Sequence, residues 1–190
     1  RFYFGERIYE RDVYEGKFSI DKLEKAVLKQ KSVYLVQCNL FYPKPGNFQM
    51  LRPNVLIRKE LDNRKKILKI DSNMIGIHIR RTDHVVSIKN SPLFLFVSKM
   101  EEEIRQDPSI RFYVASDDLG EKRKLREIFG ERVVTIFDEV RRDNQQGING
   151  AMLDLYILAS MKKIYGSSNS TYSRLAAQIW GIDLKILSVK

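Results

Sequence analysis

The sequence predicts an α/β fold in which helices cover both faces of a parallel sheet. From residue 71 onward, short apolar strands alternate with helical segments until a final strand near the C-terminus. The first of these strands, 75–80, has isoleucine at every second position, which is the period of a β-strand. Strands that alternate with helices of this length are typical of a parallel sheet.

The segments before residue 71 are less regular. Residues 1–20 are rich in aromatic side chains, and a short helix is expected over 21–28 with Asp21 near its cap. A strand is expected at about 32–38, and Pro43, Pro45 and Gly46 then interrupt the chain. Residues 48–69 are expected to be partly helical.

After residue 80, the boundaries of the helices are predicted from residues that cap or interrupt helices. Ser91-Pro92 is expected to open a helix, as a cap residue followed by proline at the first helical position, and Asp107-Pro108 to close it. Glycines then end two later helices. The expected elements are a strand over 111–116, a helix over 120–129 ended by Gly130, a strand over 133–137, a helix over 151–163, a strand over 163–166, a helix over 170–180 ended by Gly181, and a strand over 184–189.

Composition limits the class of protein. The 190 residues are 43% apolar, as in packed globular proteins, and no apolar run approaches the ~18 residues of a membrane-spanning helix. The one cysteine, Cys38, excludes an intrachain disulfide framework and a cysteine-rich zinc site, and it suits a reducing compartment. The chain begins at Arg1, so we expect a processed or truncated protein.

The net charge of +10 predicts an anionic partner. Nucleic acid, an acidic membrane surface and a sugar nucleotide all qualify. The basic residues are scattered in short runs, whereas a nucleic-acid-binding arm concentrates them, so we expect no nucleic-acid partner.

The first motif is the end of the strand over 75–80, which continues through Arg81 to Asp83. His78 and Arg80 share one face of that strand and point toward the crevice where ligands of parallel sheets bind. Buried guanidinium groups need anions, and a diphosphate supplies them through bidentate hydrogen bonds. The alternatives are an ion pair of Arg80 with Asp83 or of Arg81 with Asp117, and a core role for His78.

The second motif, Ser116-Asp117-Asp118, directly follows a strand. Adjacent carboxylates diverge, so metal chelation is less natural here than in an Asp-x-Asp pair. We expect these carboxylates to orient the arginines or to cap the helix near residue 120.

The third motif is the stretch 166–174, Gly-Ser-Ser-Asn-Ser-Thr-Tyr-Ser-Arg, between a strand and a helix. Hydroxyl side chains such as Ser168, Ser170 and Thr171 at a helix N-terminus favour a phosphate, although they also suit a simple helix cap. Asp154, one helix earlier, has the acceptors to pair with the N1–H and the amine of guanine. The alternative for Asp154 is a first-turn carboxylate that favours the helix dipole.

Together these motifs resemble the fucosyltransferase superfamily, which includes α-1,2 and α-1,6 enzymes and protein O-fucosyltransferases. His78-Ile79-Arg80-Arg81-Thr82-Asp83 resembles its His-x-Arg-Arg-x-Asp motif, and the motifs at 116–118, 154 and 168–174 resemble its second and third motifs. The resemblance covers roughly residues 71–181. It implies a GT-B-like architecture, with a Rossmann-like nucleotide-sugar-binding domain over 71–190 and the remainder of an N-terminal, acceptor-side domain and linker over 1–70.

The resemblance also implies an inverting, metal-independent enzyme without a cofactor, which moves fucose from GDP-fucose to a glycan hydroxyl. By position, Arg80 would bind the β-phosphate together with Ser168, Ser170 and Thr171. His78 and Asp154 would hold guanosine, while Arg81, Asp83 and Asp117 would support the arrangement. The catalytic candidates are then Arg80, Asp83 and His84.

The sequence departs from the family pattern in three places. His84 stands where the α-1,6 enzymes carry lysine, and the stretch 85–90 lacks the glutamate that is a candidate base. An expected Gly-x-Gly-Asn motif is also absent, so either it precedes Arg1 or this chain does not perform the full reaction. The alternatives are a non-catalytic nucleotide-sugar or glycan-binding remnant and a transferase that uses another nucleotide sugar. We expect a cytoplasmic protein with basic residues near 58–69 available to an acidic membrane surface.

Overall fold

The computed structural model describes residues 19–29, 47–138 and 143–189, and the chain divides into two compact units, Arg1–Asn47 and Phe48–Lys190. In the first unit, helix α2 (Ile20–Leu28) is capped by Ser19, whose hydroxyl accepts from the Lys22 amide at 3.3 Å. Asp21 therefore lies in the first turn and is not the cap. The strand expected over 32–38, with Cys38, lies outside the described residues.

The second unit alternates strands and helices from residue 75 onward. Its strands are β1 (Ile75–Ile79), β2 (Phe112–Ser116), β3 (Val133–Val134), β4 (Lys163–Ser167) and β5 (Asp183–Leu187). Its helices are α3 (Val55–Ile67), α4 (Val85–Asn90), α5 (Leu93–Gln106), α6 (Leu119–Phe129), α7 (Gln145–Leu158) and α8 (Thr171–Trp180), with short 3₁₀ turns η1 (Asn47–Met50) and η2 (Gly130–Arg132).

All five strands form one parallel sheet with the order β3-β2-β1-β4-β5. The central strand β1 pairs with β2 on one side and with β4 on the other, so that His78 lies between Ala115 and Gly166. The direction in which the chain winds reverses between β1 and β4. In open parallel sheets, a crevice forms at such a reversal, beyond the carboxyl ends of the strands.

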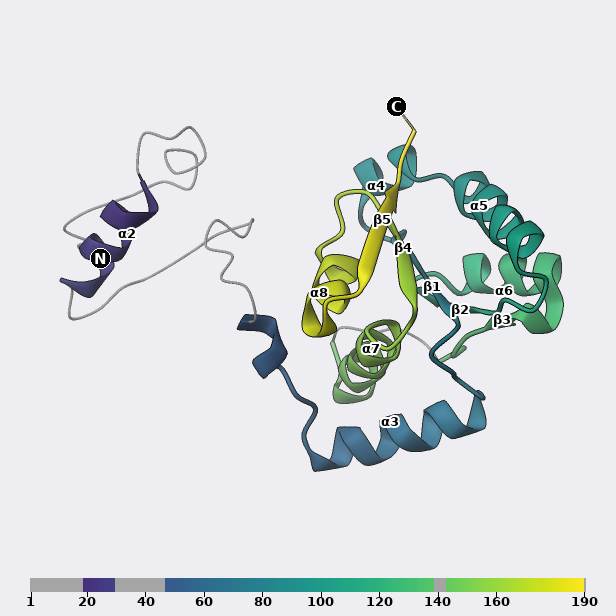
Figure 1. Cartoon of the computed structure of the whole chain (residues 1–190), viewed down its shortest axis with the longest axis horizontal. Coiled ribbons are helices and arrows are strands. Elements are labelled where there is room, and N and C mark those ends of the chain that lie inside the picture. The colour runs from purple at the N-terminus through teal and green to yellow at the C-terminus, as the bar shows by residue number, and fades with distance from the viewer. Residues whose placement is uncertain (1–18, 30–46, 139–142, 190) are drawn as a thin grey trace. The chain divides into compact units, whose positions relative to one another are not determined.

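Helices cover both faces of the sheet, as the sequence predicts (Figure 1). Helices α5 and α6 pack on one face, against the alternating isoleucines of β1. Helices α3, α7 and α8 pack on the other face, where Tyr113 and Ile164 are part of the core. The neighbouring strands β1 and β2 are therefore covered on both faces, and they are buried at every position.

Helix α3 belongs to the same compact unit as the sheet. Its residues Ile57 and Leu61 are buried in the core cluster that α7 and α8 form with the sheet. The domain boundary expected at residue 70 stays a prediction, while the compact unit that holds the sheet begins earlier, at Phe48. Within the described segments, no helix is both long and apolar enough to cross a membrane.

The boundaries of two expected helices are wrong. Helix α7 was expected over 151–163 but begins at Gln145 and ends at Leu158. Asn144 caps its start by accepting from the Gly147 amide at 2.8 Å. Glycines in its first turns hid this start, since they lower the helix propensity. Asp154 is consequently a residue of the helix interior, and its alternative role in a first turn is excluded.

The expected cap at Ser91 is also wrong by one position. Helix α5 begins at Leu93 with Pro92 as its N-cap, and an additional short helix, α4, precedes it. The Ser91 hydroxyl instead donates to the carbonyl of Leu187 at 2.5 Å and accepts from the amide of Ser168 at 2.8 Å. Ser91 thus joins the end of β5 to the loop that follows β4.

Strand β3 ends at Val134 and is shorter than the expected 133–137. At Thr135 a side-chain hydrogen bond to β2 takes the place of backbone pairing. The hydroxyl of Thr135 donates to the carbonyl of Val114 at 2.6 Å, directly after the two paired residues of β3. Gly130 and Gly181 end α6 and α8 as expected, both with positive φ (56° and 70°).

Candidate functional site

A cavity of about 710 Å³ opens at the carboxyl ends of β1, β2 and β4, where the strand order reverses. Its volume is within the range of ligand pockets, roughly 300–1,000 Å³. Residues of all three sequence motifs line it. Of the predicted site residues, the lining contains His78, Arg80, His84, Asp117, Asp154, Ser170 and Thr171.

Arg80 directly follows the last residue of β1 and is held by contacts with three residues. Its Nη1 lies 2.5 Å from Oδ2 of Asp117, its Nη2 donates to Asp83, and its backbone amide donates to the Ser167 hydroxyl at 3.0 Å. The guanidinium therefore enters the cavity with a fixed orientation. The two carboxylate contacts use only part of its fork of N–H donors, so it retains donors for an anion.

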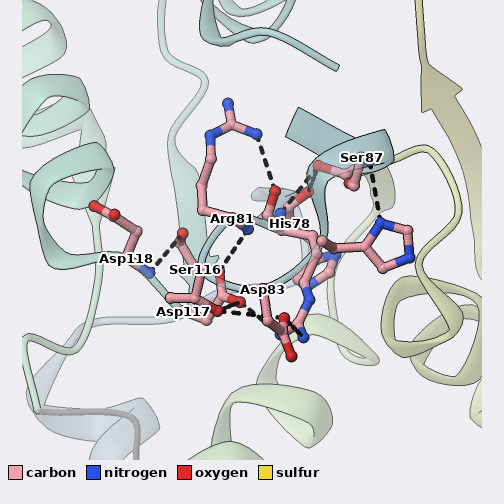
Figure 2. Close-up of polar contacts among 11 residues, drawn as sticks. His78, Arg81, Asp83, Ser87, Ser116, Asp117 and Asp118 are labelled. Carbon is pink, nitrogen blue, oxygen red and sulfur yellow. Dashed lines mark hydrogen bonds and ion pairs between the residues drawn. The ribbon is translucent and has the colours of Figure 1, made fainter. Parts of the chain in front are cut away.

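The side chain of Arg81 points away from the cavity. Figure 2 shows its side chain directed away from Asp83 and Asp117. Its guanidinium donates to the carbonyl of Ser91 at 3.1 Å and to Glu121 of α6 at 3.2 Å. Its backbone amide, and not its guanidinium, contacts Asp117. Arg81 does not line the cavity and supports the loop from behind.

The second motif divides its two carboxylates between two tasks. Asp117 accepts from Arg80, from the Arg81 amide at 2.7 Å and from the Thr82 hydroxyl at 2.7 Å. Asp118 caps α6 by accepting from the Glu121 amide at 2.9 Å. Both tasks were expected from the sequence. Among the described residues, no group of three or more His, Cys, Asp or Glu is arranged to hold a metal ion.

His78 is a buried, neutral histidine against the cavity. Its ring stacks on Tyr172, with centroids 4.9 Å apart and an interplanar angle of 28°. Burial is the main cause that lowers the pKa of His78 from 6.5 to about 4. The nearby charges have smaller effects of opposite sign, because Asp117 raises this pKa and Arg80 lowers it. Among the described residues, Nδ1 of His78 finds no hydrogen-bond partner. A buried polar atom without a protein partner indicates a place where a ligand or water completes the bonding.

Asp154 is buried between two other polar side chains. The hydroxyl of Tyr113 donates to its Oδ1, and Nζ of Lys122 lies 4.0 Å from its Oδ2. Burial raises the pKa of Asp154, although Lys122 and Tyr113 oppose that shift. A second cavity of about 430 Å³ shares Asp154 and Gly147 with the first, so this carboxylate lies between the two.

The third motif places Ser170 and Thr171 at the cavity but not Ser168. Ser170 is the N-cap of α8, yet its side chain makes no capping hydrogen bond, which removes the simple-cap alternative for this residue. Ser168 is buried, and its amide donates to Ser91. The start of α8 therefore faces the cavity without a capping bond from the Ser170 hydroxyl to its first amides.

Asp83 also lies outside the cavity lining, although it is joined to Arg80. His84 lines the cavity and caps α4. Tyr113, whose hydroxyl binds Asp154, was missed in the sequence. Tyr172, which stacks on His78, was part of the third motif but was given no role there. The alternation along β2 could have identified Tyr113, since it places that side chain on the face that α7 covers.

The comparisons with known proteins show the fold. No family model and no curated protein sequence matches the chain. The structure is similar to NodZ alpha-1,6-fucosyltransferase from Bradyrhizobium, in a crystal soaked with GDP-fucose, with a TM-score of 0.57 and 16% identity over 91% of this chain and 60% of that one.

Two further structures are similar at the same level. POFUT1 in complex with GDP has a TM-score of 0.52 and 12% identity over 74% of this chain and 48% of that one. A mutant of Arabidopsis thaliana FUT1 in complex with GDP has a TM-score of 0.52 and 18% identity over 78% of this chain and 38% of that one. The chain thus spans 38–60% of the length of these structures and has the GT-B-like fold of fucosyltransferase structures.

Proposed function

We propose that this chain carries the donor-binding half of an inverting, metal-independent glycosyltransferase that moves fucose from GDP-fucose to a glycan hydroxyl. The observation that carries the proposal is Arg80, held by two carboxylates at the mouth of a cavity between three parallel strand ends. The fold supports it, because the three similar structures were determined with GDP or GDP-fucose.

The proposed chemistry needs a fixed positive charge. In a single displacement, the acceptor oxygen bonds to the anomeric carbon as the bond to GDP breaks, and negative charge grows on the β-phosphate. A fixed guanidinium stabilises that charge more in the transition state than in the ground state. Arg80 would take this role, with Ser170, Thr171 and the first amides of α8 completing the phosphate site. The orientation that Asp117 and Asp83 impose on Arg80 supports such a task.

The guanine base would lie between His78 and Asp154. The carboxylate of Asp154 retains acceptor positions for the N1–H and the amine of guanine, even with Tyr113 bound to one oxygen. His78 is neutral, and the buried Nδ1 of its ring lacks a partner within the described segments. This pairing would favour guanine over bases that present a different pattern of donors.

The acceptor hydroxyl must lose its proton as the new bond forms. Asp83 and His84 are the two candidates beside Arg80 that could receive it. The stretch 85–90, which forms α4, contains no carboxylate. That observation favours one second candidate function, a non-catalytic remnant that binds a sugar nucleotide or glycan through the same cavity.

Calorimetric titration of the full chain with GDP, ADP and UDP, with and without magnesium, tests the proposal. We expect binding of GDP that exceeds that of ADP and UDP at least tenfold and does not change with magnesium. Preference for UDP or ADP would indicate another nucleotide sugar. A strict magnesium requirement would contradict the metal-independent mechanism, and no binding at all would contradict the donor site.

A further inference from the structure

The imidazole of His84 is fixed in one tautomer by the helix that follows it. Its Nδ1 accepts the backbone amide of Ser87 at 3.1 Å and thereby caps α4. A nitrogen that accepts an N–H carries no proton, and a neutral imidazole has one proton. The proton of His84 is therefore on Nε2.

The backbone holds this ring in place as well. The amide of His84 donates to the carbonyl of Arg81 at 3.0 Å, and the amide of Ile88 donates to the carbonyl of His84 at 3.0 Å. The residue is thus fixed by the turn before it and by the helix after it. Side chains fixed in this way present a donor without reorganisation when a ligand arrives.

We propose that His84 binds the diphosphate of the sugar nucleotide through its Nε2–H group, as a hydrogen-bond donor, and does not act as the general base. His84 lines the same cavity as Arg80 and Thr82, which come from the same loop. A base would need a lone pair on Nε2 and therefore a proton on Nδ1. That proton would point at the Ser87 N–H and break the cap of α4. The inference rests on the proposed function, because it assumes that the cavity receives a nucleoside diphosphate.

The tautomer can be measured without any ligand. The chain contains only two histidines, so long-range ¹H–¹⁵N correlation spectra of the labelled full chain give two imidazole patterns. The variant His78→Phe assigns them by removing one. We expect an unprotonated Nδ1 and a protonated Nε2 in His84. A protonated Nδ1 in neutral His84 would overturn the inference, whatever the chain binds.

Two substitutions of His84 test the roles of Nδ1 and Nε2 separately. His84→Asn keeps an acceptor near the position of Nδ1 and can cap α4, but it does not reach the position of Nε2. His84→Gln places an amide donor near the position of Nε2 and loses the cap. If His84 donates to the diphosphate, His84→Asn weakens GDP binding about tenfold or more, the effect of losing one charge-assisted hydrogen bond. We expect His84→Gln to bind GDP at least five times more tightly than His84→Asn.

The opposite order of affinities, with Asn above Gln, would assign His84 to the cap alone and overturn the proposal. Equal affinities of the two variants would overturn it as well. Failure of the wild-type chain to bind GDP is a different result, because it contradicts the proposed function while the tautomer measurement still stands. Thermal melting of both variants shows that any change in affinity is not a loss of folding.

Discussion

Asp117, at the end of β2, binds three consecutive residues that follow β1. Its carboxylate accepts from the Arg80 guanidinium at 2.5 Å, from the Arg81 amide at 2.7 Å and from the Thr82 hydroxyl at 2.7 Å. One side chain from a neighbouring strand thereby determines the shape of the arginine loop. The adjacent Asp118 performs an unrelated task as the cap of α6.

This contrast gives a prediction with an internal control. Asp117→Ala should weaken GDP binding at least tenfold and destabilise the fold by about 3 kcal/mol, because it leaves a half-buried guanidinium without its main partner. Asp118→Ala should cost about 1 kcal/mol of stability through the lost cap and leave GDP binding unchanged. Calorimetry and urea unfolding measure the two effects. Similar losses of affinity in both variants would contradict the division of tasks.

Substitutions of the two neighbouring arginines should likewise have different effects, one on function and the other on stability. Arg80→Ala is expected to abolish nucleotide turnover and leave the fold intact, because Arg80 faces the cavity. Arg81→Ala should destabilise the fold by about 3 kcal/mol, since it leaves Glu121 of α6 without its buried partner. Turnover of GDP-fucose at a temperature where both variants are folded tests the first effect, and urea unfolding measures the second. Full turnover by Arg80→Ala would remove the proposed role of this residue.

Tyr113 and Tyr165 provide a matched pair of tyrosines bound to buried carboxylates. Tyr113 donates to Asp154 beside the cavity, whereas Tyr165 donates to Glu103 on the opposite face of the sheet. Both Tyr→Phe variants should lose about 1–2 kcal/mol of stability. Only Tyr113→Phe should also weaken GDP binding, because it releases Asp154 from its orientation. Equal GDP affinity in the two variants would show that the orientation of Asp154 does not matter.

The low pKa of His78 predicts a dependence of stability on pH. The unfolded chain binds a proton at His78 near pH 6.5, whereas the folded chain does so only near pH 4, so stability falls as the pH decreases through this window. Wild type should lose about 2 kcal/mol more than His78→Phe between pH 7 and pH 5. Phenylalanine keeps a ring against Tyr172 without titrating. Urea unfolding at both pH values measures this difference, and parallel pH curves would contradict it.

A close approach of β4 and α8 predicts a steric coupling. A Cβ added to Gly166 would lie 2.6 Å from Oγ and 2.9 Å from Cβ of Ser173. Gly166→Ala should therefore destabilise the fold by about 1–3 kcal/mol. Adding Ser173→Gly should recover part of the loss, because it removes the atoms that clash, less the helix penalty of glycine. Additive effects in a double-mutant cycle would contradict the coupling.

The fold was predictable from sequence because its signals are local. The isoleucine alternation of β1 and the glycines after α6 and α8 each act within a few residues, and the parallel topology follows from the alternation of elements. The start of α7 was not predictable in this way. Its early glycines argue against a helix, and only packing on the sheet overrides that preference.

The sequence indicated which three motifs lie at the cavity, but it did not indicate the contacts of their residues, and Arg81, Asp83 and Ser168 lie outside the lining. The alternation along β1 places Arg80 on the same face as His78, but no local pattern indicates that the neighbouring Arg81 binds Glu121. That contact depends on which partners the neighbouring strand and helix bring near. The role of His84 as a cap was hidden for a similar reason, since α4 has weak signals of its own and histidine is an uncommon cap residue.

The order of the strands has a consequence for synthesis of the chain. The cavity lies between the ends of β1, β2 and β4, which the sequence separates widely, and the pairing of β1 with β4 skips over β2 and β3. A nascent chain that has emerged only as far as α6 holds Arg80 and Asp117 already, but it lacks the strand that covers the other side of β1. Until β4 arrives, the backbone N–H and C=O groups along this edge of β1 stay unpaired and available to other chains. Assembly of the cavity and protection from aggregation therefore depend on the same late pairing.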